Sequence, residues 1–222
     1  MKRVTLVSWL FCFVIQLNAQ TNFEGRIDFR MTSPDSSVNV VITAYYKKDK
    51  IRFDTQVFSA VPGMDVKNER IIIDFSDSSI FRIKEEERFV ETEKMVSNKN
   101  DDLPQLVPDS SNQLIILDRP CTGYSAGQIE KKELKEGKEV TTKASILIWY
   151  ADDLLFIVPS KFHLIQMVPL FTNGHIALGS DIHIESDGQT ISLHTRATKM
   201  EKRRLHKKVF ALPAGFPIKA SD

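Results

Sequence analysis

The stretch DIHIESDGQTISLHT, residues 181–195, decides the fold of this chain. Its Asp187-Gly188 pair is typical of a two-residue β-turn, and apolar and polar residues alternate on both sides of that turn. The register set by the turn places four apolar side chains on one face of the hairpin: Ile182, Ile184, Ile191 and Leu193. The opposite face is polar, so we predict an antiparallel hairpin with one solvated face.

The same alternation continues upstream. Phe23 begins a run in which every second residue is apolar up to Met31, while the residues between are polar or charged. Five further segments with strand patterns follow, separated by short polar turns: residues 38–46, 51–57, 70–75, 79–84 and 88–95. Because the connections are so short, the six segments predict an antiparallel meander.

The second half of the chain predicts further strands and little helix. Residues 96–113 are polar and contain two prolines, so we expect a long loop before a strand that begins at Leu114. A long hairpin is expected over residues 123–150, turned at residues 135–138. Residues 154–171 are apolar but interrupted by two prolines, and we expect a short helix there that covers the sheet.

Several of these strands are apolar on both faces. Ile71 to Ile73 and Ile146 to Trp149 are uninterrupted apolar runs, and an antiparallel strand of this kind needs cover on both sides. Since few residues have a helical pattern, the second face must be covered by loops, a short helix, curling of the sheet, or a ligand. The predicted fold is mainly β (α+β): a curved antiparallel sheet forming an incomplete barrel, with one or two short covering helices.

Composition sets the class of protein. The 222 residues, 42% hydrophobic and 27% charged, suit one globular domain and exclude disordered and multi-span membrane proteins. Thirty basic residues nearly balance 29 acidic ones, so no overall charge favours nucleic acid as a partner. Two cysteines are too few for a disulfide scaffold or a cysteine zinc site.

Residues 1–19 are typical of a secretory signal peptide, which leaves residues 20–222 as a single domain. Two basic residues precede an apolar stretch that ends at Leu17 and would span about 21 Å as a helix, less than a bilayer core. Cleavage is expected between Ala19 and Gln20, and a retained membrane anchor is the alternative. Cys12 follows the large Phe11, which argues against a lipoprotein signal. We therefore expect an exported protein of the periplasm or cell envelope, with Cys121 as a buried thiol.

One segment carries the spacing of a serine hydrolase. Gly123 to Gly127 has the pattern G-x-S-x-G around Ser125, and aspartates and histidines follow in the order such enzymes use. That motif requires a strand-to-helix turn above a parallel sheet, whereas the flanking residues predict antiparallel strands. Phosphate-binding, dinucleotide-binding and zinc-protease motifs are absent from the sequence. We therefore expect no enzymatic activity and no cofactor.

Charged residues offer two weaker candidates. Asp181, His183 and His194 share the polar face of the last hairpin, but the diagonal separation of about 7–8 Å is loose for a metal site, so no metal is expected. Residues 202–208 concentrate basic charge that either is simply solvated or contacts anionic lipid head groups or an acidic envelope partner. The residues expected to make that contact are Lys202, Arg203, Arg204, Lys207 and Lys208.

The whole mature chain resembles the DUF4412 family of exported proteins, which is common in Bacteroidetes and close in layout to the GLPGLI family. The resemblance is carried by short motifs: residues 23–27 (FEGRI), 50–54 (KIRFD), 72–75 (IIDF), 88–90 (RFV), 120–124 (PCTGY), 149–154 (WYADDL) and 210–216 (FALPAGF). It implies a half-barrel similar to the lipoprotein carrier LolA and its receptor LolB.

Two-sided apolar strands with little helix suggest a function in binding an apolar ligand, such as a lipid or a lipoprotein acyl chain. The residues expected to form that apolar face are Phe29, Ile42, Phe53, Ile72, Trp149, Phe162, Ile165 and Met167. The alternative is an envelope protein-interaction module with a closed core and no ligand. A serine hydrolase centred on Ser125 is a remote third hypothesis.

Overall fold

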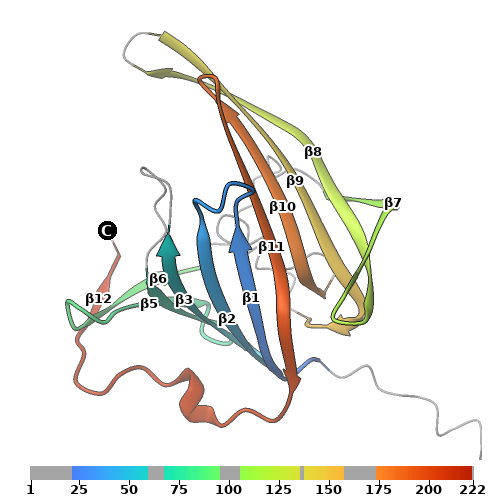
Figure 1. Ribbon diagram of the computed structural model, residues 1–222. Helices are drawn as coiled ribbons and strands as arrows, with labels where there is room; N and C mark the ends of the chain where they lie inside the picture. Colours follow the sequence, from blue (N-terminus) through green and yellow to red (C-terminus); the bar gives the residue numbers. More distant parts are fainter. Residues whose placement is uncertain (1–21, 60–67, 96–105, 136–137, 158–173, 222) are drawn as a thin grey trace, which may run out of the picture.

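A computed structural model describes residues 22–59, 68–95, 106–135, 138–157 and 174–221. They form one twelve-stranded sheet in the order β12-β6-β5-β4-β3-β2-β1-β11-β10-β9-β8-β7 (Figure 1). The strands are β1 Gly25–Thr32, β2 Asn39–Lys47, β3 Lys50–Ser59, β4 Glu69–Asp74, β5 Ser79–Lys84, β6 Phe89–Lys94, β7 Val107–Ile116, β8 Arg119–Lys135, β9 Lys138–Leu155, β10 His175–Ser186, β11 Gln189–Lys202 and β12 Ile218–Ala220.

The sheet consists of two antiparallel meanders joined side by side. β1 to β6 form the first and β7 to β11 the second, and β1 pairs with β11 to join them in the middle of the sheet. The long strands β8 to β11 extend past the ends of β1 to β3 (Figure 1). β12 adds to β6 in parallel, and each other pair of neighbouring strands is antiparallel.

Strong curvature brings strands that are not neighbours into contact. The amide of Phe23 donates to the carbonyl of Leu155 over 2.7 Å, although β1 and β9 are separated by β11 and β10. Phe156, just after β9, packs its ring against Tyr46 of β2 and against Phe75 after β4. The sheet is therefore a curved, incomplete barrel, as predicted.

The register predicted for the last hairpin is confirmed. Ile182 lies opposite Leu193, Ile184 opposite Ile191 and Asp181 opposite His194. Both turn residues have positive φ, 51° at Asp187 and 74° at Gly188, as a type I′ turn requires. The hairpin sequence therefore specified its own pairing.

The six-stranded meander is also confirmed, with strand ends within two residues of the expected ones. The expected loop over residues 96–113 is partly wrong, because β7 already begins at Val107 and carries a β-bulge between Asp109 and Gln113. The described residues contain no α-helix. The helix expected over residues 154–171 starts inside β9, and its residues from 158 onward lie outside the described part of the chain.

Gly25 explains how closely β1 and β11 approach each other. A Cβ atom at this position would lie 2.2 Å from the carbonyl oxygen of Glu201 and 2.7 Å from the Phe23 ring. Only a residue without a side chain fits such an approach. Gly25 therefore allows β1 and β11 to approach closely enough to pair at the junction of the two meanders.

A C-terminal segment covers the outer face of the first meander. This segment, residues 203–217, is called the strap below; it includes the short 3₁₀-helix η2, Lys207–Phe210. In Figure 1 it runs from the end of β11 beneath β1 to β6 and leads to β12. Leu205 and Phe210 are buried against Ile72, Ile83 and Val90, and these five residues are called the strap cluster. The cover needed by the two-sided strands of this half therefore comes from the chain's own C-terminal end.

Hydrogen bonds from the first meander fix the strap. The Glu24 carboxylate accepts from the Leu205 amide over 2.7 Å, and the Glu24 carbonyl accepts from the Arg203 amide over 3.1 Å. Arg52 Nη1 donates to the Val209 carbonyl over 2.7 Å. These bonds satisfy backbone groups that have no sheet partner of their own.

Candidate functional site: the inner apolar cluster

The inner surface of the curved sheet carries an extended apolar cluster. It draws residues from both meanders. This inner cluster comprises Phe23, Ile27, Phe29, Ala44, Tyr46, Ile51, Phe53, Ile73, Phe75, Ile116, Cys121, Trp149, Ala151, Leu154, Phe156, Ile176, Leu178 and Ala197. Within a strand, cluster members such as Ile27 and Phe29 of β1 or Trp149 and Ala151 of β9 are two residues apart, which is the period of a β-strand.

Aromatic rings close one end of the inner cluster. Tyr46 lies between Phe23 and Phe156 with ring centroids 5.8 and 5.5 Å away, and Phe75 lies 6.4 Å from Phe156. Edge-to-face and tilted packing of this kind adds about 0.5–1.5 kcal/mol per pair beyond the area buried. Burial raises the pKa of the Tyr46 phenol above its ordinary value, so the ring remains neutral.

The structure brings together four of the eight residues predicted to form an apolar binding face. Phe29, Phe53 and Trp149 belong to the inner cluster with exposed fractions of 4%, 4% and 6%, and the half-buried Ile42 packs against it. Ile72 does not share this face; it lies in the strap cluster, because consecutive residues of β4 point to opposite sides of the sheet. The predicted residues Phe162, Ile165 and Met167 lie outside the described part of the chain.

A polar network borders the inner cluster at Trp149. The guanidinium carbon of Arg196 lies 4.4 Å from the centre of the Trp149 ring. Arg196 also donates to both carboxylate oxygens of Asp181, over 2.7 and 3.2 Å, and His194 Nδ1 lies 2.8 Å from Asp181 Oδ1. Burial opposes the ionisation of Asp181, but the hydrogen bonds from Arg196 and His194 outweigh it and hold the pKa of this carboxyl below its usual range.

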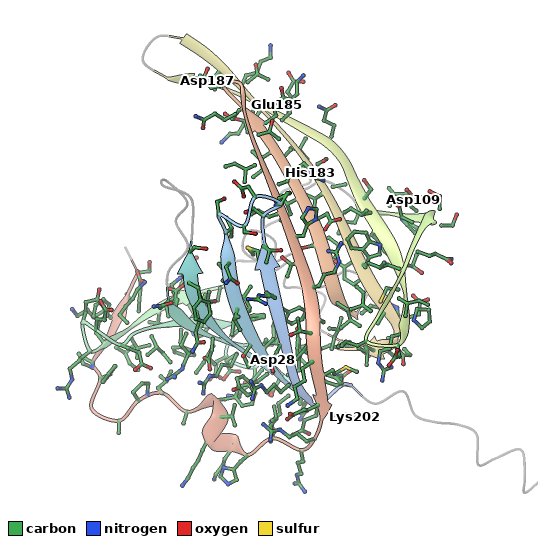
Figure 2. The ribbon with its side chains drawn as sticks, in the orientation of Figure 1. Asp28, Asp109, His183, Glu185, Asp187 and Lys202 are labelled. Carbon is green, nitrogen blue, oxygen red and sulfur yellow. The ribbon has the colours of Figure 1, made fainter. Side chains whose placement is uncertain are left out.

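Hydrogen bonds already engage Asp181, His183 and His194, the three residues considered as metal ligands. Asp181 is engaged by a permanently charged arginine, which competes with any cation for the carboxylate. His183 turns its Nδ1 to Ser192, 2.9 Å away, and stands further out along the hairpin (Figure 2). Within the described ranges no group of three metal-ligating side chains is found.

Ser125 lies on a β-bulge rather than on a strand-to-helix turn. It pairs with Leu147 of β9 and Val107 of β7, and the register shifts before Gln128. Its hydroxyl accepts from the Gly127 amide over 3.0 Å, and Gly127 has φ 69°. The G-x-S-x-G spacing therefore serves a bulge, in which glycine supplies the positive φ.

The basic residues predicted to meet a partner are all exposed. Lys202 ends β11, Arg203 and Arg204 begin the strap, and Lys207 and Lys208 open η2. In Figure 2 Lys202 lies at the lower end of β11, where the strap starts.

The strap itself was not predicted, although a signal was present. Apolar residues recur among the basic ones between positions 205 and 216: Leu205, Val209, Phe210, Leu212 and Phe216. The buried, free Cys121 was predicted correctly, and its burial raises the pKa of the thiol. Within the described residues, no helix is long and apolar enough to cross a membrane.

Neither a family model nor a curated protein matches this chain. Solved structures with a similar arrangement of strands include an uncharacterised conserved protein from Thermus thermophilus, with a TM-score of 0.49 and 5% identity over 96% of this chain and 99% of that one. PNGF-II aligns with a TM-score of 0.47 and 12% identity over 90% of this chain and 31% of that one. A domain assigned to an outer membrane lipoprotein-sorting protein from Vibrio parahaemolyticus aligns with a TM-score of 0.32 and 8% identity, over 90% of this chain and 95% of that one.

Proposed function

We propose that this protein is a non-enzymatic protein of the cell envelope that holds an apolar ligand, a lipid or a lipoprotein acyl chain, against the inner cluster. One observation carries the proposal: the sheet curves until Phe156 meets Tyr46 and Phe75, so that a broad apolar surface lies inside the curve. Binding sites for apolar ligands are concave, mostly apolar and bordered by a few polar groups. Arg196 and Asp181 supply such a polar border beside Trp149.

A second candidate is an interaction module with a closed core. It is favoured by the low exposure of Phe29, Phe53 and Trp149, since side chains that are 4–6% exposed offer a ligand no free surface until the packing opens. The two candidates therefore differ in one physical respect: whether an acyl chain can reach Trp149.

The tryptophans of this chain allow a direct test. The sequence has two, Trp9 in the N-terminal apolar stretch and Trp149 in the inner cluster. In a Trp9→Phe chain the only indole is Trp149, whether or not the leader is retained. Bromine atoms on a fatty acid quench indole fluorescence at contact, so titration with a brominated fatty acid reports entry into the inner cluster.

We expect saturable quenching with the brominated acid and none with its unbrominated form. Ile42→Thr, which places a hydroxyl beside the inner cluster, is expected to weaken binding, whereas Val209→Thr, which places a hydroxyl beside the strap cluster, leaves it unchanged. Absence of quenching, with a bare polypeptide mass in native mass spectrometry of protein from its own envelope, would favour the interaction module. A bound mass followed by solvent extraction would name the ligand class.

A further inference from the structure

The strap carries basic side chains whose charge is not balanced. Lys202, Arg204, Lys207 and Lys208 are exposed, and within the described ranges none of them has a carboxylate within ion-pair distance. Arg203 lies 3.6 Å from Glu201, a carboxylate that Lys199 already contacts at 2.6 Å. These five residues, Lys202, Arg203, Arg204, Lys207 and Lys208, are called the basic run.

Cations on the strands beside the strap are arranged differently. Arg26 is paired with Asp28 at 2.8 Å, and Arg52 and Arg70 both contact Asp54, at 2.5 and 3.2 Å. The carboxylates that neutralise these arginines come from the same or the adjacent strand. Arg26, Arg52 and Arg70 are therefore neutralised within the sheet, unlike Lys202, Arg204, Lys207 and Lys208 of the basic run.

The backbone beneath the basic run is fixed even though its side chains are solvated. Leu205 is 3% exposed, and its amide and carbonyl are bound by the side chains of Glu24 and Lys47. Phe210 is buried after Lys207 and Lys208. Leu205 and Phe210 anchor the strap to the sheet. The charged side chains between them therefore extend into solvent from a backbone whose position is already fixed.

The basic run also lies where the chain enters the fold. The Arg203 amide donates to the carbonyl of Glu24, which is seven residues after Leu17, the last residue of the N-terminal apolar stretch. Seven extended residues span at most about 25 Å. While a leader that ends at Leu17 is in a bilayer, the start of the basic run at Arg203 therefore lies within about that distance of the lipid surface.

We propose that the basic run docks this protein on a bilayer surface rich in anionic phospholipid. Each lysine or arginine close to such a surface strengthens binding about fivefold, and the attraction declines within a Debye length of about 8–10 Å. Membrane docking by the basic run uses the outside of the strap, whereas the proposed apolar ligand binds at the inner cluster. Either proposal can be refuted without the other, since quenching of Trp149 by a soluble brominated acid requires no membrane surface.

Vesicle cosedimentation with the full exported chain tests the proposal. Binding is compared between vesicles of phosphatidylcholine alone and vesicles with about 40 mol% phosphatidylglycerol, a composition chosen for the assay, and the ratio removes any contribution of an apolar leader. We expect wild type to prefer the anionic vesicles and to lose that preference at high salt. Lys207→Gln/Lys208→Gln is expected to lower the preference about 25-fold, at about fivefold per charge.

The control variant, Lys131→Gln/Lys132→Gln, removes the same charge from β8 in the second meander and should keep the preference. Equal losses in the two variants would overturn the proposal, because the effect would then be one of net charge. Wild-type binding that is the same on both vesicles would also overturn it, and would leave an acidic protein as the occupant of the basic run.

Discussion

The two faces of the first meander are both apolar, yet they are covered in different ways. The outer face meets the strap, which returns from the far end of the sequence: Glu24 and Leu205 are 181 residues apart in a hydrogen bond of 2.7 Å. The inner face lies within the curve of the sheet and carries the larger cluster, with aromatic rings from both meanders. The outer face is therefore covered by one continuous segment of the chain, whereas the inner face is covered by the curvature of the sheet itself.

The largest expected effect compares one ring from each face. Phe156→Ala removes a fully buried ring that contacts Tyr46 and Phe75, and should lower the free energy of unfolding by about 3–5 kcal/mol. Phe210→Ala on the strap should cost less, about 1–3 kcal/mol, because a surface segment can relax over the gap. Urea unfolding measures both. If Phe210→Ala lowered the free energy of unfolding more than Phe156→Ala, the strap cluster and not the inner cluster would be the principal core.

A smaller effect is expected from loosening the strap. Glu24→Gln removes the negative charge that faces Lys47 at 3.4 Å and weakens acceptance from the Leu205 amide. We expect a loss of about 1–2 kcal/mol, together with faster proteolysis between residues 203 and 216. The exposed Glu93→Gln is the matched control and should change stability by less than about 0.5 kcal/mol. Unchanged proteolysis in Glu24→Gln would show that apolar packing alone holds the strap.

The smallest effect concerns the polar border of the inner cluster and depends on pH. The pKa of Asp181 is lower in the folded protein than in the unfolded chain, so its contribution is present above the unfolded value and is lost as pH falls through the folded one. The pKa of Asp74, which lies beside Lys50, is also lowered and acts in the same direction. Urea midpoints should fall below about pH 4, and Asp181→Asn should fall less steeply than wild type. If the urea midpoints of wild type and Asp181→Asn have the same pH dependence, the ionised Asp181 carboxylate does not contribute to stability.

Local patterns were sufficient where the pairing is local. The Asp187-Gly188 turn and alternation on either side placed Asp181 opposite His194, and the six segments of the first meander were found with ends within two residues. The register of a hairpin is set by the type of turn and by the two-residue period of apolar and polar side chains, and both can be recognised within a short segment of sequence. The start of β7 was missed, because its bulge and Pro108 interrupt the alternation that would have indicated a strand.

The candidate site was only partly predictable. Phe29, Phe53 and Trp149 lie together in the inner cluster, whereas Ile72 lies in the strap cluster. In an uninterrupted apolar run such as Ile71 to Ile73, the sequence does not indicate which residue faces which cluster. Likewise the contact of Arg196 with Trp149 joins β11 to β9 across a strand, and no spacing along the chain indicates it.

By itself, the sequence determined the class of the fold, its meanders and the hairpin register, because these depend on the nearest neighbours along the chain. Tertiary structure decided which apolar face is which. The curvature that brings Phe23 to Leu155 and the strap that returns from residue 203 to the first meander both arise from contacts between distant segments. Such contacts depend on how twist and bulges accumulate over the whole sheet, and no single segment specifies that sum.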